Sequence, residues 1–294
     1  MTMGPFVESC RPREWSKNLL LFAGVLFSHH LFDAAYLLRA AAGFFLFSFV
    51  ASSIYLFNDL MDREKDLAHP EKRFRPIPSG KLPRTAAAAG VVLLAAPSLA
   101  LGFLLWPGFG VSLAIYFVLN LAYSTWLKRL VILDVLSISL GFVIRAIAGV
   151  EALRSVDSEV LISPWLLVCT FFASLFLAVC KRRSELTLLQ EEAGQHRDSL
   201  DHYSLGLTDH IIAVTAGITV LSFSLYTIWP DTTAKFGTGD LIYTVPFVVY
   251  GLFRYMYLVH ERGLGGKPAD ILFSDRPLLV NIVLWAAAVL LILY

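Results

Sequence analysis

The chain alternates long apolar runs with short polar segments, and the apolar runs have the length that crosses a membrane. A helix rises about 1.5 Å per residue and the hydrocarbon core of a bilayer is about 30 Å thick, so one span needs roughly 20 mainly apolar residues. Nine segments meet this requirement, the first only just: 18–32, 39–58, 85–106, 108–127, 130–152, 160–180, 210–230, 241–259 and 277–294. All should be helical, because lipid cannot satisfy the hydrogen bonds of an open strand edge.

Composition supports the same conclusion. Of the 294 residues, 57% are hydrophobic and 16% charged, against roughly 45–50% and 25% in soluble domains. A water-soluble globular enzyme is therefore excluded, and we expect an all-α polytopic membrane protein made of one domain, residues 1–294. The net charge of +1 gives no argument for a nucleic acid partner.

The distribution of the cations predicts the orientation, since cytoplasmic loops carry an excess of Lys and Arg. Of 24 such residues, Arg39, Arg154 and Lys235 fall on one side and Arg145 and Arg254 lie inside spans, which leaves 19 on the other side. The N-terminus is therefore expected in the cytoplasm and the C-terminus outside.

A faint internal repeat suggests how the spans are organised. At an offset of about 121 residues, segment 53–64 lies over segment 174–185. This indicates two four-helix halves plus a ninth helix around a cavity open to the cytoplasm. The segment 181–209 is too polar to span and is expected to be a helix on the cytoplasmic surface.

A cluster of acidic residues follows the second apolar run. On a continuing helix, Asp59, Asp62 and Asp66 lie within about 60° of one another. Such carboxylates repel unless a divalent cation neutralises them, and Mg²⁺ binds through one or two carboxylates plus substrate phosphates. The stretch beyond supplies cations that suit phosphate: Lys72, Arg73 and Arg75. A solvated helix end in an ordinary loop remains the alternative.

Two charged residues lie about three turns apart in the span 130–152, Asp134 and Arg145. An Arg within the membrane is costly and faces a cavity or a partner. Arg145 is therefore either a substrate contact or half of a structural ion pair with an acid on another helix. Arg254, near the end of span 241–259, is interpreted as a snorkelling side chain.

Two further polar motifs flank spans. Lys17 and Asn18 precede the first span, and Lys181, Arg182 and Glu185 follow the sixth. Membrane anchoring would explain Lys17, and the positive-inside bias would explain the later cations equally well.

Taken together, the motifs resemble those of the UbiA-type intramembrane prenyltransferase superfamily. They are Asn58-Asp59-x-x-Asp62-x-x-x-Asp66 and Tyr123-Ser124-x-x-x-Lys128. The resemblance implies that the first motif holds Mg²⁺ against a diphosphate and that Tyr123 and Lys128 contact phosphate. Members usually carry a second Asp-rich motif after the sixth helix, and this chain departs from that pattern with Lys181-Arg182-x-x-Glu185.

The departure points to one branch, the decaprenyl-phosphate phosphoribosyltransferases. The branch motifs are Arg11-Pro12-x-x-Trp15-x-Lys17-Asn18, His69-Pro70-x-Lys72-Arg73-x-Arg75-Pro76-Ile77, Asp134 with Arg145-Ala-x-Ala-Gly149, and the cationic motif after helix six. This resemblance implies transfer of 5-phosphoribose from 5-phosphoribosyl 1-diphosphate to a polyprenyl phosphate. The lipid would be the acceptor, in a bacterial plasma membrane and in a pathway to lipid-linked arabinose for cell-wall arabinan.

Residue roles follow from that resemblance. The expected catalytic residues are Asp59, Asp62, Asp66 and Lys17, and the three aspartates are also the expected Mg²⁺ ligands. The expected substrate-binding residues are Asn18, Asn58, Lys72, Arg73, Arg75, Tyr123, Lys128, Asp134, Arg145, Lys181, Arg182 and Glu185. Whether the protein forms homo-oligomers stays open.

Two rival functions stay in view. A prenyltransferase acting on an aromatic acceptor would need a second acidic motif where the chain has cations. A transporter of phosphorylated solutes would place its charges at the bilayer midplane, in interrupted helices, whereas these charges cluster at cytoplasmic helix ends.

Overall fold

The structure is a computed structural model that describes residues 3–28, 30–68, 70–189, 198–266, 270–271 and 274–294. Every regular element in this described part is a helix. Eight of these helices are long and apolar enough to cross a membrane. The all-helical membrane architecture expected from the apolar runs is therefore confirmed, although the count of nine spans is not.

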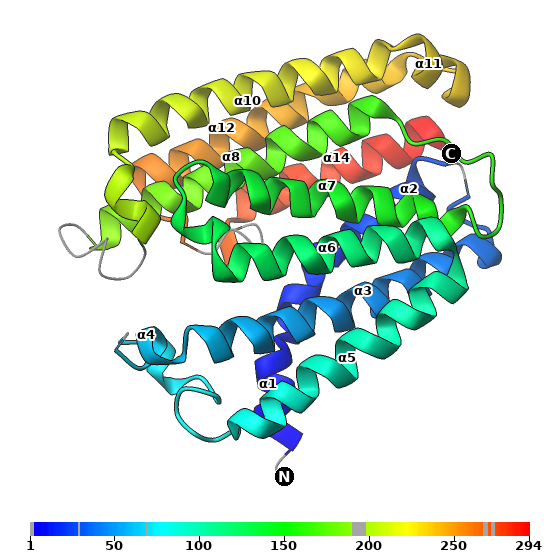
Figure 1. Cartoon of the computed structure of the whole chain (residues 1–294). Helices are drawn as coiled ribbons and strands as arrows, with labels where there is room; N and C mark the ends of the chain where they lie inside the picture. Colours follow the sequence, from blue (N-terminus) through cyan, green and yellow to red (C-terminus); the bar gives the residue numbers. More distant parts are fainter. Residues whose placement is uncertain (1–2, 29, 69, 190–197, 267–269, 272–273) are drawn as a thin grey trace. The chain divides into compact units, whose positions relative to one another are not determined.

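The chain divides into two compact units, which are described separately. Unit 1 comprises residues 1–130 and 140–162, and unit 2 comprises residues 131–139 and 163–294. Figure 1 labels the helices. Unit 1 contains α1 (Met3–Cys10), η1 (Pro12–Phe22), α2 (Ala23–Leu26), α3 (Ala34–Met61), α4 (Arg63–Ala68), η2 (Lys72–Phe74), α5 (Arg84–Leu105), α6 (Pro107–Thr125), η3 (Leu127–Arg129) and most of α7 (Leu133–Leu153).

Unit 2 holds the first residues of α7 and the later helices. These are α8 (Pro164–Leu189), η5 (Asp198–His202), α10 (Leu205–Ile228), α11 (Pro230–Phe236), η6 (Asp240–Thr244), α12 (Val245–Glu261) and α14 (Arg276–Leu293). Each unit thus holds four of the eight long helices, as an internal repeat of four-helix halves would require. The ninth helix, the shared cavity and the single domain remain predictions.

The expected first span, 18–32, is not among the eight candidate spans. Its first part belongs to the 3-10 helix η1, and four residues of α2 follow. A 3-10 helix rises about 2.0 Å per residue, against about 1.5 Å in an α-helix, so η1 and α2 together cover about 28 Å. The segment therefore gains length from its conformation, which a residue count cannot reveal.

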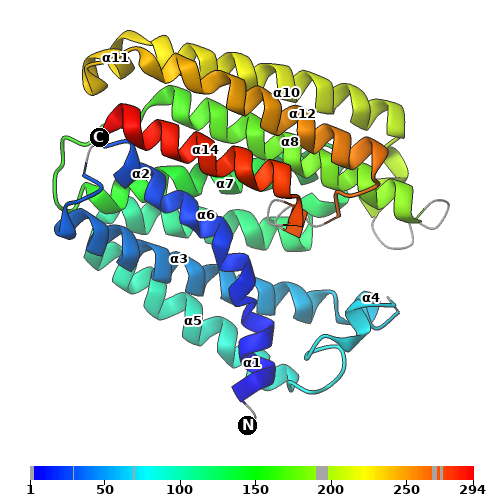
Figure 2. The same ribbon diagram turned by 180° about the vertical axis from the view of Figure 1, so that it is seen from behind.

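Contacts with α3 explain why η1 keeps the tighter winding. Asn18 Nδ2 donates to Ser48 Oγ at 3.0 Å and Trp15 Nε1 donates to Ser52 Oγ at 3.0 Å. Three residues of a 3-10 helix and four residues of an α-helix both rise about 6 Å. The two helices therefore stay in register, and Figure 2 shows the N-terminal segment crossing α3.

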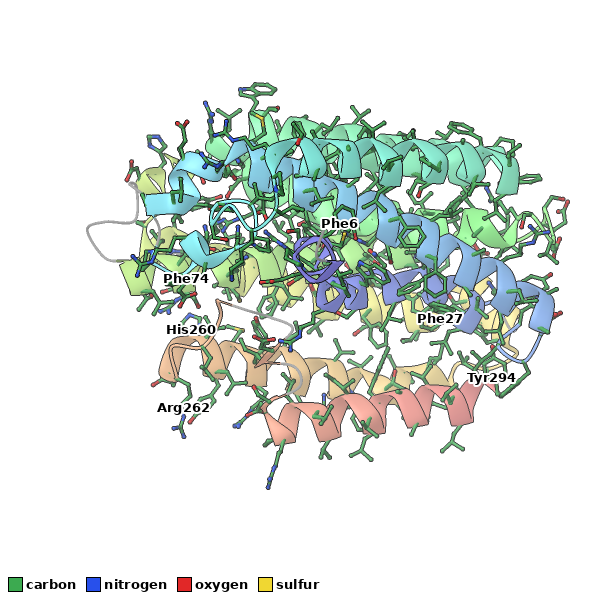
Figure 3. The ribbon with its side chains drawn as sticks, turned by 90° about the horizontal axis from the view of Figure 1, so that it is seen from below. Phe6, Phe27, Phe74, His260, Arg262 and Tyr294 are labelled. Carbon is green, nitrogen blue, oxygen red and sulfur yellow. The ribbon has the colours of Figure 1, made fainter. Side chains whose placement is uncertain are left out.

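Apolar packing fixes the rest of unit 1. Leu21, Phe47 and Phe109 are fully buried in one cluster of η1, α3 and α6 side chains. A second cluster joins α1 to α3 and α5, where Phe6 (Figure 3) packs beside Leu56. These clusters hold the polar ends of α3 and α6 in fixed positions.

Unit 2 is organised around α8, which packs closely with α10. Phe176, Val179 and Cys180 of α8 are buried in its main apolar cluster. The helix continues to Leu189, nine residues beyond the predicted end of the span. Residues 181–189 are therefore helical as a continuation of α8, the expected position of 181–209 on the cytoplasmic surface stays a prediction, and the part at 190–197 lies outside the described residues.

Candidate active site

The acidic motif lies where α3 gives way to α4 in unit 1. Asp59 and Asp66 are 1% and 4% exposed, and Arg75 connects them. Its Nη1 atom is 3.1 Å from Asp59 Oδ1 and 2.9 Å from Asp66 Oδ2. The chain beyond α4 therefore turns back so that one guanidinium bridges two buried carboxylates.

Arg11 is a second cation on the same carboxylate. Its Nη2 atom lies 2.5 Å from Asp59 Oδ1, and its guanidinium lies 5.0 Å from the centre of the Tyr55 ring. Both guanidiniums therefore bind one oxygen of a nearly inaccessible side chain.

The third aspartate is paired separately. Asp62 is at the C-cap of α3, and both its oxygens accept from Lys128 Nζ, at 2.6 and 2.7 Å. Lys128 also lies 3.4 Å from Asn58 Oδ1. The two sequence motifs after α3 and α6 thus meet in space, with three carboxylates facing three cations.

Burial changes the ionisation of this site. Burial raises the pKa of Asp66 above its ordinary value, and the nearby Arg75 charge opposes that rise. The nearby cations therefore favour the ionised form of Asp66, although the side chain is poorly solvated.

The donor set suits a hard divalent cation. Mg²⁺ prefers oxygen ligands, and one nitrogen of Arg75 lies within 3.1 Å of oxygens from both Asp59 and Asp66. Those oxygens are thus at most about 6 Å apart, with a cationic atom between them. No three His, Cys, Asp or Glu side chains in the described part of the chain are gathered into a metal-binding set, because arginine and lysine occupy the positions between the carboxylates.

Arg145 forms a second polar centre of unit 1. It is 6% exposed and donates to Asn18 Oδ1 at 2.8 Å, to Tyr116 Oη at 2.7 Å and to its own helix at Gly141 O, 3.0 Å away. Its guanidinium also lies 4.9 Å from the Phe142 ring centre. Within the described residues its hydrogen-bond acceptors are all neutral, so the alternative of an ion pair with an acid is not what the structure shows.

Gly149 allows η1 to approach α7 at this centre. A Cβ atom at position 149 would lie 2.4 Å from the carbonyl oxygen of Leu21. Arg145 and Gly149 are one turn apart, so one face of α7 both bonds to Asn18 and makes room for the η1 backbone.

Unit 2 contains its own buried network around Asp134. This carboxylate is 0% exposed and accepts from Arg182 Nε at 2.8 Å and from Tyr203 Oη at 2.8 Å. Arg182 is 1% exposed and also pairs with Glu185. Lys181 Nζ lies 3.9 Å from Glu185 Oε1, and the Lys181 side chain is more exposed than that of Arg182. The cationic motif near the end of α8 is thus largely paired internally.

Tyr203 links this network to the α6–α7 connection. Its Oη accepts from the backbone N–H of Ile132 at 2.8 Å, and Ile132 has a left-handed backbone with φ of 70°. Burial raises the pKa of Tyr203, and the adjacent Asp134 carboxylate adds to the rise. The hydroxyl therefore stays protonated and can donate to Asp134.

The other predicted residues lie on or beside these elements. Lys17 is half-exposed and pairs with Glu14 at 2.5 Å. Arg73 is exposed and lies over the Phe74 ring at 4.8 Å. Lys72 and Tyr123 are partly buried at η2 and near the end of α6.

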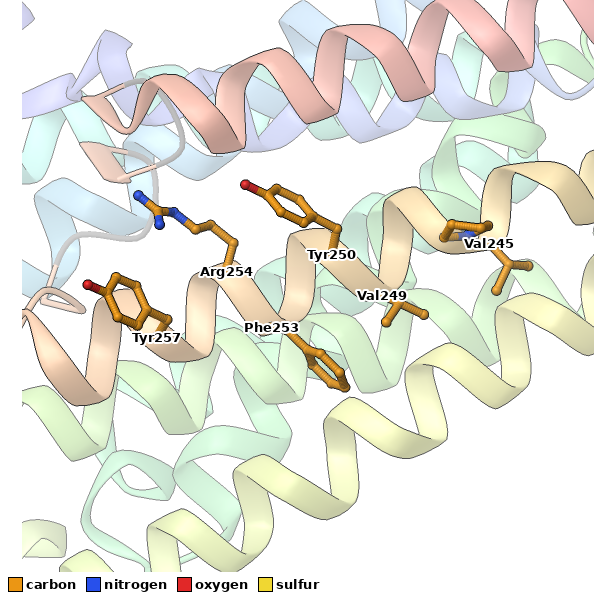
Figure 4. A pocket seen from close by; sticks show the side chains of 7 residues that line it. Val245, Val249, Tyr250, Phe253, Arg254 and Tyr257 are labelled. Atoms are coloured by element: carbon orange, nitrogen blue, oxygen red, sulfur yellow. The ribbon is translucent and has the colours of Figure 1, made fainter.

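The interpretation of Arg254 as a snorkelling side chain stays a prediction, to which the structure adds an ion pair with Asp275. Arg254 binds both oxygens of Asp275, at 3.1 and 2.8 Å, and Asp275 in turn caps α14 by accepting from Leu278 N. Figure 4 shows Arg254 between Tyr250 and Tyr257 on the face of α12 that lines a cavity of about 610 Å³. This cavity contains none of the predicted site residues.

The sequence of the chain matches a known family of membrane enzymes. Residues 19–273 match the model of the UbiA prenyltransferase family. The chain therefore belongs to the UbiA prenyltransferase family. With eight candidate spans, it is a multi-pass membrane protein.

The relatives within the UbiA family support the branch named from the motifs. Decaprenyl-phosphate phosphoribosyltransferase of Mycolicibacterium smegmatis is 33% identical over 296 residues, covering 96% of this chain and 90% of the relative. The enzyme of that name from Mycobacterium tuberculosis is also 33% identical and covers 96% and 92%. The structure of a UbiA homolog from Archaeoglobus fulgidus bound to GPP and Mg²⁺ has a TM-score of 0.72 at 18% identity, covering 98% and 99%. The fold and the resemblance to the phosphoribosyltransferases are thus confirmed.

Three residues of the polar networks around Asp59, Arg145 and Asp134 were not predicted from the sequence: Arg11, Tyr116 and Tyr203. Arg11 stands in the quoted N-terminal motif, so its position could have marked it. Tyr116 lies 29 residues before Arg145 in an apolar span, and Tyr203 is 69 residues from Asp134. Neither tyrosine has a local sequence signal that distinguishes it from other aromatic residues of the chain.

Proposed function

We propose that the protein transfers 5-phosphoribose from 5-phosphoribosyl 1-diphosphate to a polyprenyl phosphate and releases diphosphate. The names of relatives that align over nearly the full length of both chains support the choice of substrates. The structural observation that carries the proposal is the buried pair Asp59 and Asp66 bridged by Arg75, beside Asp62 and Lys128. Such a set of oxygens and cations suits a metal-bound diphosphate.

Unit 2 supports the phosphoribosyl donor over a prenyl donor. Enzymes of the superfamily that use a prenyl diphosphate usually carry a second acidic motif at this place. Here the carboxylate is Glu185, which is paired with Arg182. Asp134 is likewise occupied by Arg182 and Tyr203. The segment around Glu185 offers one carboxylate beside two cations, Lys181 and Arg182, and this composition fits one metal-binding acidic motif better than two.

Breaking the ribosyl C1–O bond leaves positive charge at C1 and negative charge on the departing diphosphate. Asp59, Asp62 and Asp66 would hold Mg²⁺, which would neutralise the diphosphate as it leaves. Arg75 and Lys128 contact these carboxylates and are placed to share the phosphate charge.

The acceptor needs little activation. A lipid phosphate is anionic at neutral pH, so its oxygen can attack C1 without a general base, provided that cations orient it. We assign the phosphates not bound by the metal to Lys17, Arg145, Lys181 and Arg182. Of these, Lys181 is more exposed than Arg182, which is buried and paired with Asp134 and Glu185.

The reaction is proposed to take place at the cytoplasmic face of a bacterial plasma membrane, as a step toward lipid-linked arabinose for cell-wall arabinan. The bias of Lys and Arg toward one side of the spans and the bacterial sources of the relatives support this placement.

The test incubates purified protein with labelled 5-phosphoribosyl 1-diphosphate, Mg²⁺ and a polyprenyl phosphate. A parallel mixture contains a labelled prenyl diphosphate and an aromatic acid. We expect label to enter the organic phase in the first mixture and to depend on Mg²⁺. Transfer in the second mixture alone would replace this function with aromatic prenylation.

Asp62→Asn tests the role of the acidic motif. Partners that only orient metal ligands contribute about 10–100-fold, so loss of a ligand should lower turnover at least about 100-fold. Glu64→Gln removes an exposed carboxylate two residues away and should leave turnover unchanged. Equal activity of both variants would show that the motif is only a solvated helix end.

A further inference from the structure

Asp59 is paired with cations to an unusual degree for a carboxylate expected to bind a metal. Arg11 Nη2 lies 2.5 Å and Arg75 Nη1 lies 3.1 Å from the same oxygen, Oδ1. The side chain is 1% exposed, so water contributes little to its solvation. The two guanidiniums therefore supply most of the charge compensation at Asp59.

The backbone conformation that places Arg11 beside Asp59 is energetically unfavourable. Arg11 adopts the left-handed conformation, with φ 51° and ψ 62°, at the N-cap of η1. For a residue other than glycine this conformation costs on the order of 1–2 kcal/mol and persists only where surrounding contacts impose it.

Those contacts are present on both sides of Arg11. The carbonyl of Cys10 accepts from Ser52 Oγ at 2.9 Å, and the Trp15 indole donates to the same hydroxyl at 3.0 Å. The ring of Tyr55, one turn from Asp59 on α3, has its centre 5.0 Å from the Arg11 guanidinium and attracts that charge. Arg11 is thus held beside Asp59 by two neighbouring groups of α3, the Ser52 hydroxyl and the Tyr55 ring.

A guanidinium and a divalent metal compete for the same carboxylate oxygen. Mg²⁺ coordinates carboxylates at about 2.0–2.1 Å, so an ion on Oδ1 would stand within a few ångströms of two positive groups. That repulsion is strong where solvent is scarce. A diphosphate relieves it, because arginine binds phosphate oxygens through paired hydrogen bonds.

We propose that Arg11 and Arg75 are internal counter-ions of Asp59 that a diphosphate must draw away before a divalent cation binds there, so that metal and diphosphate bind cooperatively. This inference rests on the proposed function, because it takes Asp59 as a metal ligand. It adds Arg11 to the binding site and assigns both arginines two alternate partners, the carboxylate and the phosphate.

If metal and diphosphate bind cooperatively in this way, removing Arg11 should change their affinities in opposite directions: the metal should bind more tightly and the diphosphate substrate more weakly. Without the competing charge, Arg11→Ala should bind metal alone more tightly, by at least about threefold. The same variant should bind the diphosphate substrate about tenfold more weakly, since a charge-assisted hydrogen bond contributes about 1.5–3 kcal/mol and 1.4 kcal/mol is tenfold. A residue with only a structural role would weaken both ligands.

The experiment is equilibrium dialysis of the full-length protein in detergent, with Mn²⁺ as the metal. Bound Mn²⁺ is measured without substrate and with 5-phosphoribosyl 1-diphosphate, and bound substrate is measured at saturating Mn²⁺. Arg13→Ala is the control, because Arg13 is an exposed cation of the same segment. Arg11→Gln, which keeps a neutral donor toward Asp59, is tested beside Arg11→Ala, and melting temperatures verify that each variant is folded.

The outcomes separate this inference from the proposed function. Tighter Mn²⁺ binding and weaker substrate binding in the Arg11 variants, with Arg13→Ala unchanged, support cooperative exchange. If the wild-type protein binds Mn²⁺ with substrate but the Arg11 variants bind Mn²⁺ alone no more tightly, the inference fails and the function stands. If Asp59→Asn binds Mn²⁺ and substrate as the wild-type protein does, both fail.

Discussion

Replacement of Gly149 by alanine would test the close approach of η1 to α7. The added Cβ would lie 2.4 Å from Leu21 O and 2.8 Å from Leu21 Cα. These are backbone atoms, which cannot rotate away as a side chain could. Restoring an ordinary contact of about 3.4 Å requires η1 to move by about 1 Å.

That displacement reaches the polar centre one turn away. The hydrogen bond from Arg145 Nε to Asn18 Oδ1 is 2.8 Å long, and an added 1 Å takes it beyond hydrogen-bonding distance. Overpacking costs about 1–3 kcal/mol and loss of a hydrogen bond from a charged group about 1.5–3 kcal/mol. The gain in helix propensity offsets up to about 1 kcal/mol. We expect a net loss of about 1.5–5 kcal/mol.

Gly141, two turns earlier in α7, provides a matched control. A Cβ atom there would lie 3.6 Å from Arg145 Nη1 and 3.7 Å from the Tyr116 ring, which are ordinary contacts. Gly141→Ala should therefore be neutral or slightly stabilising through helix propensity.

The assay is thermal unfolding in detergent, followed by tryptophan fluorescence, together with phosphoribosyl transfer. Gly149→Ala should melt several degrees lower and lose activity, while Gly141→Ala should match the wild-type protein in both. A Gly149→Ala protein as stable as the Gly141→Ala protein would refute the tight packing of η1 against α7.

Two further predictions concern unit 2. Tyr203→Phe removes the acceptor of the Ile132 N–H and one of the donors to the buried Asp134, so we expect a loss of about 1–3 kcal/mol in a melting experiment; wild-type stability would contradict this role. The hydrogen bond from Arg254 lowers the pKa of Asp275, so the pair stabilises the fold above the ordinary Asp pKa, and this stability is lost as pH falls through the lowered pKa. The difference in melting temperature between wild type and Asp275→Asn should therefore be constant from about pH 5 to pH 8 and shrink below about pH 4, whereas a difference that grows in acid would contradict the pairing.

The fold was largely predictable because a membrane helix must satisfy its backbone within one long apolar segment. What hydropathy marks, however, is the first charge and not the last helical residue. In α8 the charged residues Lys181, Arg182 and Glu185 remain helical, because Arg182 is buried against Asp134. The 3-10 conformation of η1 was equally hidden, since it depends on Ser48 and Ser52 of another helix.

The candidate site was predictable where its chemistry is local in sequence. Asp59 and Asp66 are two turns apart, and Arg75 follows within the next segment, so spacing indicated that they could meet. The position of Arg11 depends on a left-handed backbone and on contacts 48 residues away. Such a partner is fixed by tertiary structure, and no periodicity of the sequence encodes it.

The polar face of η1 has a consequence for how the protein is inserted into the membrane. Asn18 obtains one partner, Ser48, 30 residues later in the chain and another, Arg145, 127 residues later. When η1 leaves the ribosome, Arg145 has not been synthesised and α3 does not yet lie beside η1, and the polar groups of this short segment oppose partition into lipid by itself. The η1 segment is therefore expected to reach its final depth only after α7 has been inserted, so a ribosome-bound chain that ends before Arg145 should leave Asn18 accessible to water-soluble reagents.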